Sequence, residues 1–145
     1  MRISAKGRYA MAAMIYMTNH LSDTEPMTVN RVSNDLGISK IYLEQVFALL
    51  KRGGFVKSVK GAQGGYYLNR RPENISAYDI LQIVEGALFE GAQEMVMDKA
   101  PLIDRVIRED ILAELDEAVK TALSHMSIAS LAEKAAAERA PMYYI

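Results

Sequence analysis

The spacing of the apolar residues changes at Gly53 and Gly54, and this change restricts the possible folds more than any other feature of the chain. Residues 43–50 place apolar side chains at helical intervals, whereas residues 55–59 and 66–69 are rich in the β-branched and aromatic types found in strands. A glycine-rich loop joins the two extended segments. A helix that stops at a glycine pair and leads into a short hairpin predicts a mainly α-helical fold with one small β-hairpin.

Two further helices precede this one. Ser4 is placed to cap the first, and Thr28 is placed to cap the second, which Gly37 ends. Ser39 then occupies the cap position of the helix that carries residues 43–50. A helix, a short glycine-containing turn and a second helix form a helix-turn-helix, and a hairpin that follows directly is the wing of a winged helix.

The chain divides into four parts on this interpretation. Residues 1–86 form the winged helix-turn-helix domain, and residues 87–100, which show weak periodicity, form a linker segment. Residues 101–140 hold a long helix and a final alanine-rich helix, and residues 141–145 form a tail.

The long helix carries an apolar stripe and a mainly acidic opposite face. The stripe begins near Leu102 and includes the candidate dimerisation residues Ile103, Val106, Ile107, Ile111, Leu115, Val119 and Leu123. Such a stripe, attached to a small DNA-binding module, predicts a dimerisation helix. The alternative is that the same stripe packs on the winged helix of its own chain.

The two halves of the chain carry opposite charge. Residues 1–72 hold 11 Lys and Arg against 4 Asp and Glu, a net charge of +7, whereas residues 73–145 hold 6 against 14, a net charge of −8. A basic module neutralises phosphates and releases their counterions, which gives affinity for nucleic acid of any sequence. Double-stranded DNA is therefore the first partner to expect.

Composition excludes several other functions. The chain has no cysteine, which removes disulfides, thiolate metal ligands and thiol redox sensing. No apolar run reaches the length of about 18 residues that a membrane span needs, and the amino terminus lacks the apolar core of an export signal, so we expect a cytoplasmic protein. His20 and His125 lie in no sequence context typical of a general base or a metal site, and we therefore expect no enzymatic activity.

The candidate DNA-binding residues come from the first helix, the third helix and the wing. Lys6 and Arg8 oppose the dipole of the first helix, which favours a second role in binding phosphate. In the third helix, Ile41 and its neighbours occupy the amino-terminal part that enters the major groove. The full set is Ser4, Lys6, Arg8, Tyr9, Ser39, Lys40, Tyr42, Glu44, Gln45, Lys51, Arg52, Lys57, Lys60, Gly61, Gln63 and Gly64. Glu44 either accepts a hydrogen bond from cytosine N4 or is a solvent-exposed helix former.

Several motifs in the first 86 residues resemble the Rrf2 family of winged-helix regulators. They are the segments 1–10 (MRISAKGRYA), 38–39 (IS) with 42–45 (YLEQ), 56–61 (VKSVKG), 64–66 (GGY) and 85–86 (EG), in the family's order. The resemblance implies a homodimeric transcription repressor on a palindromic operator, with the long helix as the dimer contact. It further implies that residues 42–45 enter the major groove and that Lys60 probes the minor groove.

One departure from the family pattern concerns the cofactor. Members that bind an iron-sulfur cluster carry three cysteines between the winged helix and the dimer helix, and residues 87–105 contain none. We therefore expect no cofactor and no cluster. Met95 and Met97 are interpreted as packing residues, since thioethers alone hold such a cluster poorly.

The chain ends in Met142, Tyr143, Tyr144 and Ile145. The tail is similar to that of the family's repressor of cysteine metabolism, and the resemblance implies that cysteine synthase docks on it and that O-acetylserine dissolves the complex. A free carboxylate beside Ile145 can itself mimic an anionic amino acid, although the tail can also pack on its own domain. Two alternatives stay open: a regulator that senses a small ligand directly, and an interaction module that inhibits cysteine synthase.

Overall fold

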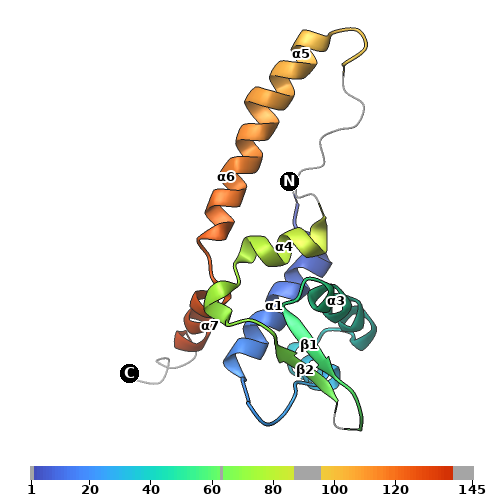
Figure 1. Ribbon diagram of the computed structural model, residues 1–145, viewed down its shortest axis with the longest axis vertical. Coiled ribbons are helices and arrows are strands. Elements are labelled where there is room, and N and C mark those ends of the chain that lie inside the picture. Colours follow the sequence, from blue (N-terminus) through green and yellow to red (C-terminus); the bar gives the residue numbers. More distant parts are fainter. Residues whose placement is uncertain (1, 63, 87–95, 139–145) are drawn as a thin grey trace.

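A computed structural model describes residues 2–62, 64–86 and 96–138. A compact body carries one long helix that extends away from it (Figure 1). The elements, in chain order, are α1 (Ala5–Asn19), α2 (Val29–Leu36), α3 (Lys40–Arg52), β1 (Val56–Val59), β2 (Gly65–Leu68), the 3-10 turn η1 (Pro72–Asn74), α4 (Ala77–Glu85), α5 (Pro101–Val106), the π-helical segment η2 (Ile107–Leu112), α6 (Ala113–Ser124) and α7 (Ile128–Ala137).

Five of the helices begin at a residue whose side chain caps the helix. In each, a hydroxyl oxygen accepts a hydrogen bond from a backbone N–H in the first turn, which satisfies one of the donors that a helix start leaves unpaired. The caps of α1, α2, α3, α4 and α7 are Ser4, Thr28, Ser39, Ser76 and Ser127. Gly37 ends α2 in the left-handed conformation at φ 67°, where a glycine carries no steric penalty. The caps and turn predicted for the helix-turn-helix are therefore present.

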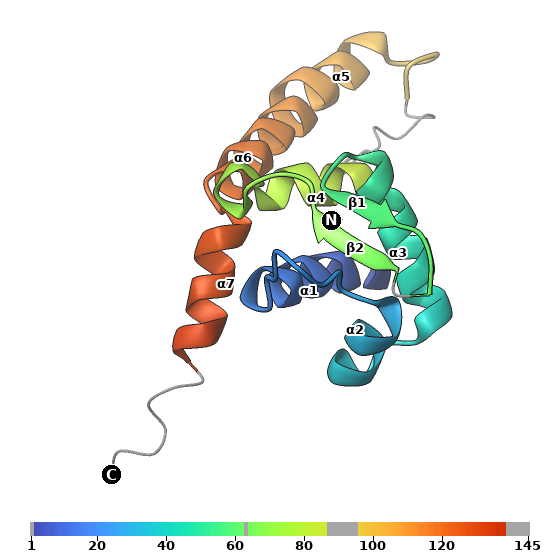
Figure 2. The same ribbon diagram turned by 60° about the horizontal axis from the view of Figure 1, so that its bottom comes forward.

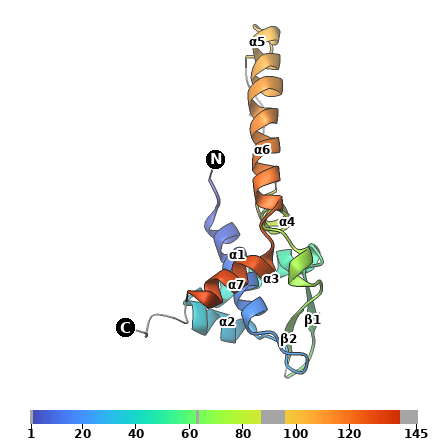
Figure 3. The same ribbon diagram turned by 90° about the vertical axis from the view of Figure 1, so that its left-hand side faces the viewer.

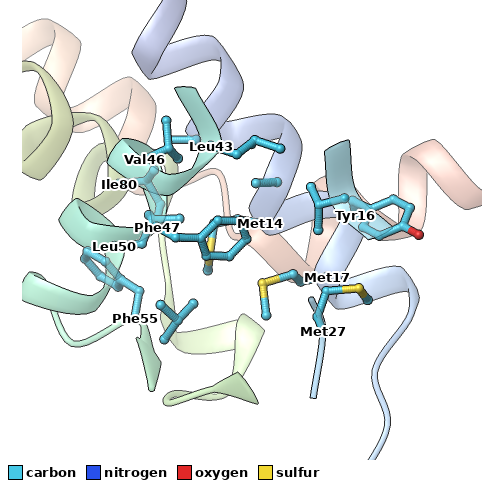
Figure 4. Packing of buried hydrophobic residues seen from close by; sticks show 14 of the residues in the cluster. Met14, Tyr16, Met17, Met27, Leu43, Val46, Phe47, Leu50, Phe55 and Ile80 are labelled. Carbon is cyan, nitrogen blue, oxygen red and sulfur yellow. The ribbon is translucent and has the colours of Figure 1, made fainter. Parts of the chain in front are cut away.

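The core lies where α1, α3 and the hairpin meet. Met14 of α1 and Leu43, Phe47 and Leu50 of α3 are fully buried, and Figure 4 shows them among the side chains of this cluster. The ring of Phe47 also stacks on Tyr66 of β2, with centroids 4.6 Å apart. This packing fixes the third helix and the wing to one core.

The hairpin is a two-stranded antiparallel sheet in which Val56 pairs with Leu68 and Val59 with Gly65. The first strand begins one residue later than the sequence predicts and ends where predicted, and the second begins and ends one residue earlier. Met27 forms an isolated antiparallel bridge with Tyr66 of β2. Its N–H donates to the backbone oxygen of Tyr66, and its backbone oxygen accepts from the N–H of Tyr66, both at 2.8 Å. The loop before α2 is thereby tied to the wing.

The long helix differs from its prediction in the middle. The sequence predicts one regular helix from Pro101, but α5 and α6 are separated by a π-helical segment at residues 107–112. A π turn takes up an extra residue and is seldom visible in sequence spacing. The helix projects from the body on the side away from the hairpin (Figure 3). Within the described ranges, no helix is both long and apolar enough to cross a bilayer.

Helix α7 turns back onto the body and lies beside α1 (Figure 2). Ile128 and Ala132 on its inner face are buried. The N–H of Ala77 donates to the oxygen of Met126 and the N–H of Ile128 donates to the oxygen of Ile75, both at 2.8 Å. The sequence predicts this helix as the final, alanine-rich one of residues 101–140, and in the structure its residue Ile128 belongs to the core of the winged-helix body.

Candidate nucleic-acid interface

Helix α3 has one buried face and one exposed face. Val46 and Phe47 are fully buried, while Lys40, Glu44 and Gln45 are exposed on the opposite side. This division follows from the spacing of the apolar residues, because positions three and four apart share a face of a helix. The helix therefore presents the residues that the sequence assigns to the major groove, and Ser39 at its cap is also exposed.

Tyr42 is the member of this set that does not face solvent freely. Its ring packs edge-on against the ring of Tyr9 of α1, with centroids 5.2 Å apart and an interplanar angle of 87°. Both tyrosines are half-buried against the core. The pair brings the first turns of α1 to the start of α3, so the structure places together two of the three groups of predicted DNA contacts. Each tyrosine of this pair can bind a phosphate only through its hydroxyl group.

The start of α1 is held by a carboxylate from α4. Glu85 Oε1 accepts hydrogen bonds from the backbone N of Ser4 at 2.9 Å and from Ser4 Oγ at 2.7 Å. Ser4 Oγ in turn accepts from the N–H of Gly7 at 3.1 Å. A negative group at a helix amino terminus is favoured by the helix dipole. Ser4 is thus already bonded within the chain, and its role as a predicted phosphate contact has to compete with Glu85.

The cations near this helix start differ in exposure. Arg8 is exposed, whereas Lys6 is half-buried. Lys51 and Arg52 are exposed in the last turn of α3, where their charge also favours the helix carboxyl end. All four remain available to a polyanion that lies along α3.

The wing supplies the third group of predicted contacts. Lys57 on β1 and Lys60 after it are exposed. The loop turns through Gly61 at φ 114°, a backbone conformation that favours glycine, and the N–H of Gly64 donates to the oxygen of Gly61 at 3.0 Å. Gln63 lies outside the described residues.

A second polar link, not foreseen from the sequence, joins α1 to α2. The hydroxyl of Tyr16 donates a hydrogen bond to Asp35, and Arg31 lies 3.9 Å from the same carboxylate. Burial raises the pKa of the Tyr16 phenol above its ordinary value, and the hydrogen bond to Asp35 raises it further. The phenol therefore stays protonated and fixes the first helix of the helix-turn-helix to α1.

The predicted dimerisation stripe is exposed along the long helix. Leu102 is 70 %, Ile103 59 % and Ile111 57 % exposed, and Val106 and Leu115 are also exposed. Ile107, Val119 and Leu123 are half-buried. The stripe therefore does not pack on the body of its own chain along most of its length.

The part of the chain that the structure describes contains a helix-turn-helix, a hairpin wing and a basic surface, and these define a winged-helix DNA-binding transcription regulator. The sequence profile of the Rrf2 family, an iron-dependent transcriptional regulator, matches residues 3–134. The chain belongs to the Rrf2 family.

Curated relatives and solved structures agree with this assignment. The HTH-type transcriptional regulator CymR of Bacillus subtilis is 32% identical over 146 residues, which is 100% of both chains. The HTH-type transcriptional regulator IscR of Yersinia enterocolitica is 30% identical over 131 residues, 90% of this chain and 79% of the relative. The structure of CymR, the global cysteine regulator of B. subtilis, matches with a TM-score of 0.70 at 31% identity, covering 92% of this chain and 98% of that one. T. potens IscR matches with a TM-score of 0.74 at 28% identity, covering 99% and 97%. These relatives are transcription regulators and not enzymes, as the sequence predicts.

The residues present do not fit an iron-sulfur cluster. The chain has no cysteine to supply thiolates. Within residues 2–62, 64–86 and 96–138, no three His, Asp or Glu side chains converge into a metal site. In the segment that precedes the long helix, the sulfur of Met97 lies 3.7 Å from Arg108 Nη2, and Arg108 Nε lies 2.6 Å from the buried carboxylate of Asp104. Met95 and the tail residues Met142, Tyr143, Tyr144 and Ile145 lie outside the described residues.

Proposed function

We propose that this chain is a homodimeric repressor that binds a palindromic operator without a cofactor. The exposed polar face of α3, set on a fully buried opposite face, carries this proposal. In a helix-turn-helix such a face lies in the major groove, and two copies related by a two-fold axis read two half-sites. Lys60 and the glycine loop of the wing would then approach the minor groove beside each half-site.

DNA binding is tested by its dependence on salt. A basic surface that neutralises phosphates loses affinity steeply between about 50 and 200 mM salt, with a slope of about 0.9 for each phosphate contact. Lys51→Ala and Lys60→Ala each should weaken binding for all sequences and lower that slope by about 1. Lys134→Ala, which removes an exposed lysine on α7, is the matched control and should change neither.

The dimer is supported by the exposed stripe of the long helix. Ile103 and Leu115 lie on that stripe and are exposed in the single chain. A second copy that covers them would remove apolar surface from water at about 25 cal/mol per Å². Ile103→Asp and Leu115→Asp should therefore give monomers in sedimentation analysis and lose operator affinity. Leu21→Asp, at an exposed apolar residue in the loop after α1, should leave the dimer intact.

The signal is proposed to come from cysteine metabolism. The support is the similarity to CymR, whose structure is described as that of a global cysteine regulator, together with the lack of cysteine ligands. Cysteine synthase docked on residues 142–145 would strengthen operator binding, and O-acetylserine would dissolve the complex. By linkage, operator DNA must then strengthen synthase binding by the same factor.

Calorimetric titration into cysteine synthase tests this mechanism. The full chain should bind and should be displaced by O-acetylserine, whereas a chain that lacks Tyr144 and Ile145 should not bind. If neither form binds, the partner mechanism is wrong. If the full chain binds the synthase but binds no operator with the expected salt dependence, the chain is an inhibitory module instead.

A second candidate is a regulator that senses a small ligand directly. A polar hollow of about 510 Å³ lies between the start of α4 and the junction of α6 with α7. Asp79, Ser124 and His125 are among its lining residues. Because the long helix meets the winged-helix body here, a ligand in this hollow would couple the dimer to DNA binding. Regulation of operator binding by a metabolite without any protein partner would favour this candidate.

A further inference from the structure

Ile41 is the second residue of α3 and is 72 % exposed, as much as Leu102 on the dimerisation stripe at 70 %. Its neighbours on the same face, Lys40, Glu44 and Gln45, are polar. A large aliphatic side chain held in water among charged residues costs hydration free energy that a polar residue at the same site would avoid. Single exposed apolar residues are common on protein surfaces, but this one lies on the face of α3 that the proposed function places against DNA.

We do not expect dimerisation through the long helix to cover Ile41. The exposed apolar stripe belongs to the long helix, which projects from the body (Figure 1), whereas Ile41 lies at the start of α3 within the body. Opposite Ile41 on α3, Val46 and Leu50 are fully buried, so the helix cannot turn to hide it without unpacking the core. The residue is fixed in place and directed outward.

The major groove offers one apolar group to such a residue. Among the four bases, only thymine presents a methyl group on its major-groove edge, and aliphatic side chains contact it. In a helix-turn-helix the amino-terminal residues of the second helix lie at the base edges. The exposure of Ile41, its place in the first turn of α3 and its lack of polar atoms all match this group.

We propose that Ile41 contacts the C5-methyl of a thymine in each half-site and selects a T·A pair there. The contact rests on the proposed DNA-binding function and gives one residue of the interface a defined base. Glu44 lies three residues further along α3, which is about 4.5 Å along the helix axis. Because base pairs are spaced by about 3.4 Å, Glu44 would reach an edge one or two pairs from the selected thymine.

Replacement of thymine by 2′-deoxyuridine tests the contact, because it removes only the methyl group. Operator sites are first selected from a random duplex pool with the full-length wild-type protein. Each thymine of the selected site is then replaced in both half-sites, and affinity is measured by fluorescence anisotropy at fixed salt. One position should lose about threefold to tenfold in affinity per half-site, the range expected for one or two buried carbon groups.

Variants at the same residue decide whether Ile41 is responsible. Ile41→Ala should bind the thymine operator more weakly than wild type does, by a similar factor. The same variant should bind the deoxyuridine operator as tightly as it binds the thymine operator. Ile41→Val, which keeps a branched side chain, should retain most of the sensitivity. Met126→Ala, at an exposed apolar residue between α6 and α7, should behave as wild type. Circular dichroism and thermal melting confirm that each variant is folded.

The outcomes separate this inference from the proposed function. If wild type binds with a steep salt dependence but tolerates deoxyuridine at every position, the thymine contact is wrong and the regulator remains. If the sensitivity survives in Ile41→Ala, another residue reads the methyl and the inference is equally wrong. If no duplex is bound in a salt-dependent manner, the DNA-binding function fails, and the contact fails with it.

Discussion

A single methyl group added at Gly7 tests how the start of α1 is held. A Cβ atom at this position would collide with Glu85 Oε1 and would lie 3.0 Å from Ile3 Cγ2. The carboxylate is the far end of a flexible side chain, so moving it costs little sterically. Moving it does, however, break the two hydrogen bonds that it accepts from Ser4. Gly7→Ala therefore acts chiefly through Glu85.

The expected change in stability is the balance of two terms. Two hydrogen bonds to a carboxylate at an exposed site contribute about 1–2 kcal/mol together, below the value for buried charged groups. Replacing glycine by alanine in the first turn of a helix stabilises the folded chain by about 0.5 kcal/mol. Gly7→Ala should thus lower the free energy of unfolding by about 1 kcal/mol, which corresponds to about 3 °C in Tm for a chain of this size.

The sign should reverse when the carboxylate is absent. In a Glu85→Ala background, the methyl group meets no carboxylate, and Gly7→Ala should stabilise by about 0.5 kcal/mol. Urea denaturation of the four proteins gives the coupling free energy, and all are measured at one fixed concentration because the proposed dimer would contribute to stability. A coupling near zero, or a stabilising Gly7→Ala in the wild-type background, would refute this account of the helix start.

Three further changes test the packing and the turn. Phe47→Ala should destabilise by about 3–5 kcal/mol in urea, because it empties a fully buried site and removes the stack on the wing. Gly37→Ala should cost about 1 kcal/mol from its positive φ alone, since open space surrounds the position, and a variant as stable as wild type would contradict this. Tyr16→Phe should cost about 1 kcal/mol through the lost hydrogen bond to Asp35. The raised pKa of Tyr16 means that the folded chain keeps a proton that the unfolded chain loses, so this contribution is complete below pH 10.0 and falls as pH rises further. Alkaline melts should show a weaker pH dependence for Tyr16→Phe, and an unchanged dependence would argue against that role.

Local signals in the sequence were sufficient for the winged helix. Each predicted cap, Ser4, Thr28 and Ser39, accepts the expected backbone hydrogen bond, because capping depends only on residues within one turn. Gly37 likewise ends its helix in the conformation that its residue type permits. The hairpin was also predictable, since its apolar period and its glycine loop are both local properties.

The interactions that join distant segments could not be predicted in this way. Glu85 bonds to Ser4 across 81 positions, and neither residue carries a local sign of the other. The bond between Tyr16 and Asp35 spans a turn, a loop and most of a second helix. The position of α7 against α1 depends on the same kind of long-range packing. For the interface, the sequence indicated which residues lie on α3 but could not show that Tyr42 is partly covered by Tyr9.

The π-helical turn at residues 107–112 sets the direction in which the two halves of the long helix face. One residue of an α-helix corresponds to about 100° of rotation, and the wider turn takes up one extra residue, so the two halves face as they would in a regular helix that lacks this residue. Deletion of one residue here should restore a regular helix and leave Ile103 facing as before relative to Leu115, whereas straightening the segment with no residue removed would rotate Ile103 by about 100°. The wider turn therefore keeps the proposed dimer contact aligned with the DNA-binding body although the helix holds one residue more than a regular helix would, and it is the conformation of this segment, more than its length, that sets the alignment.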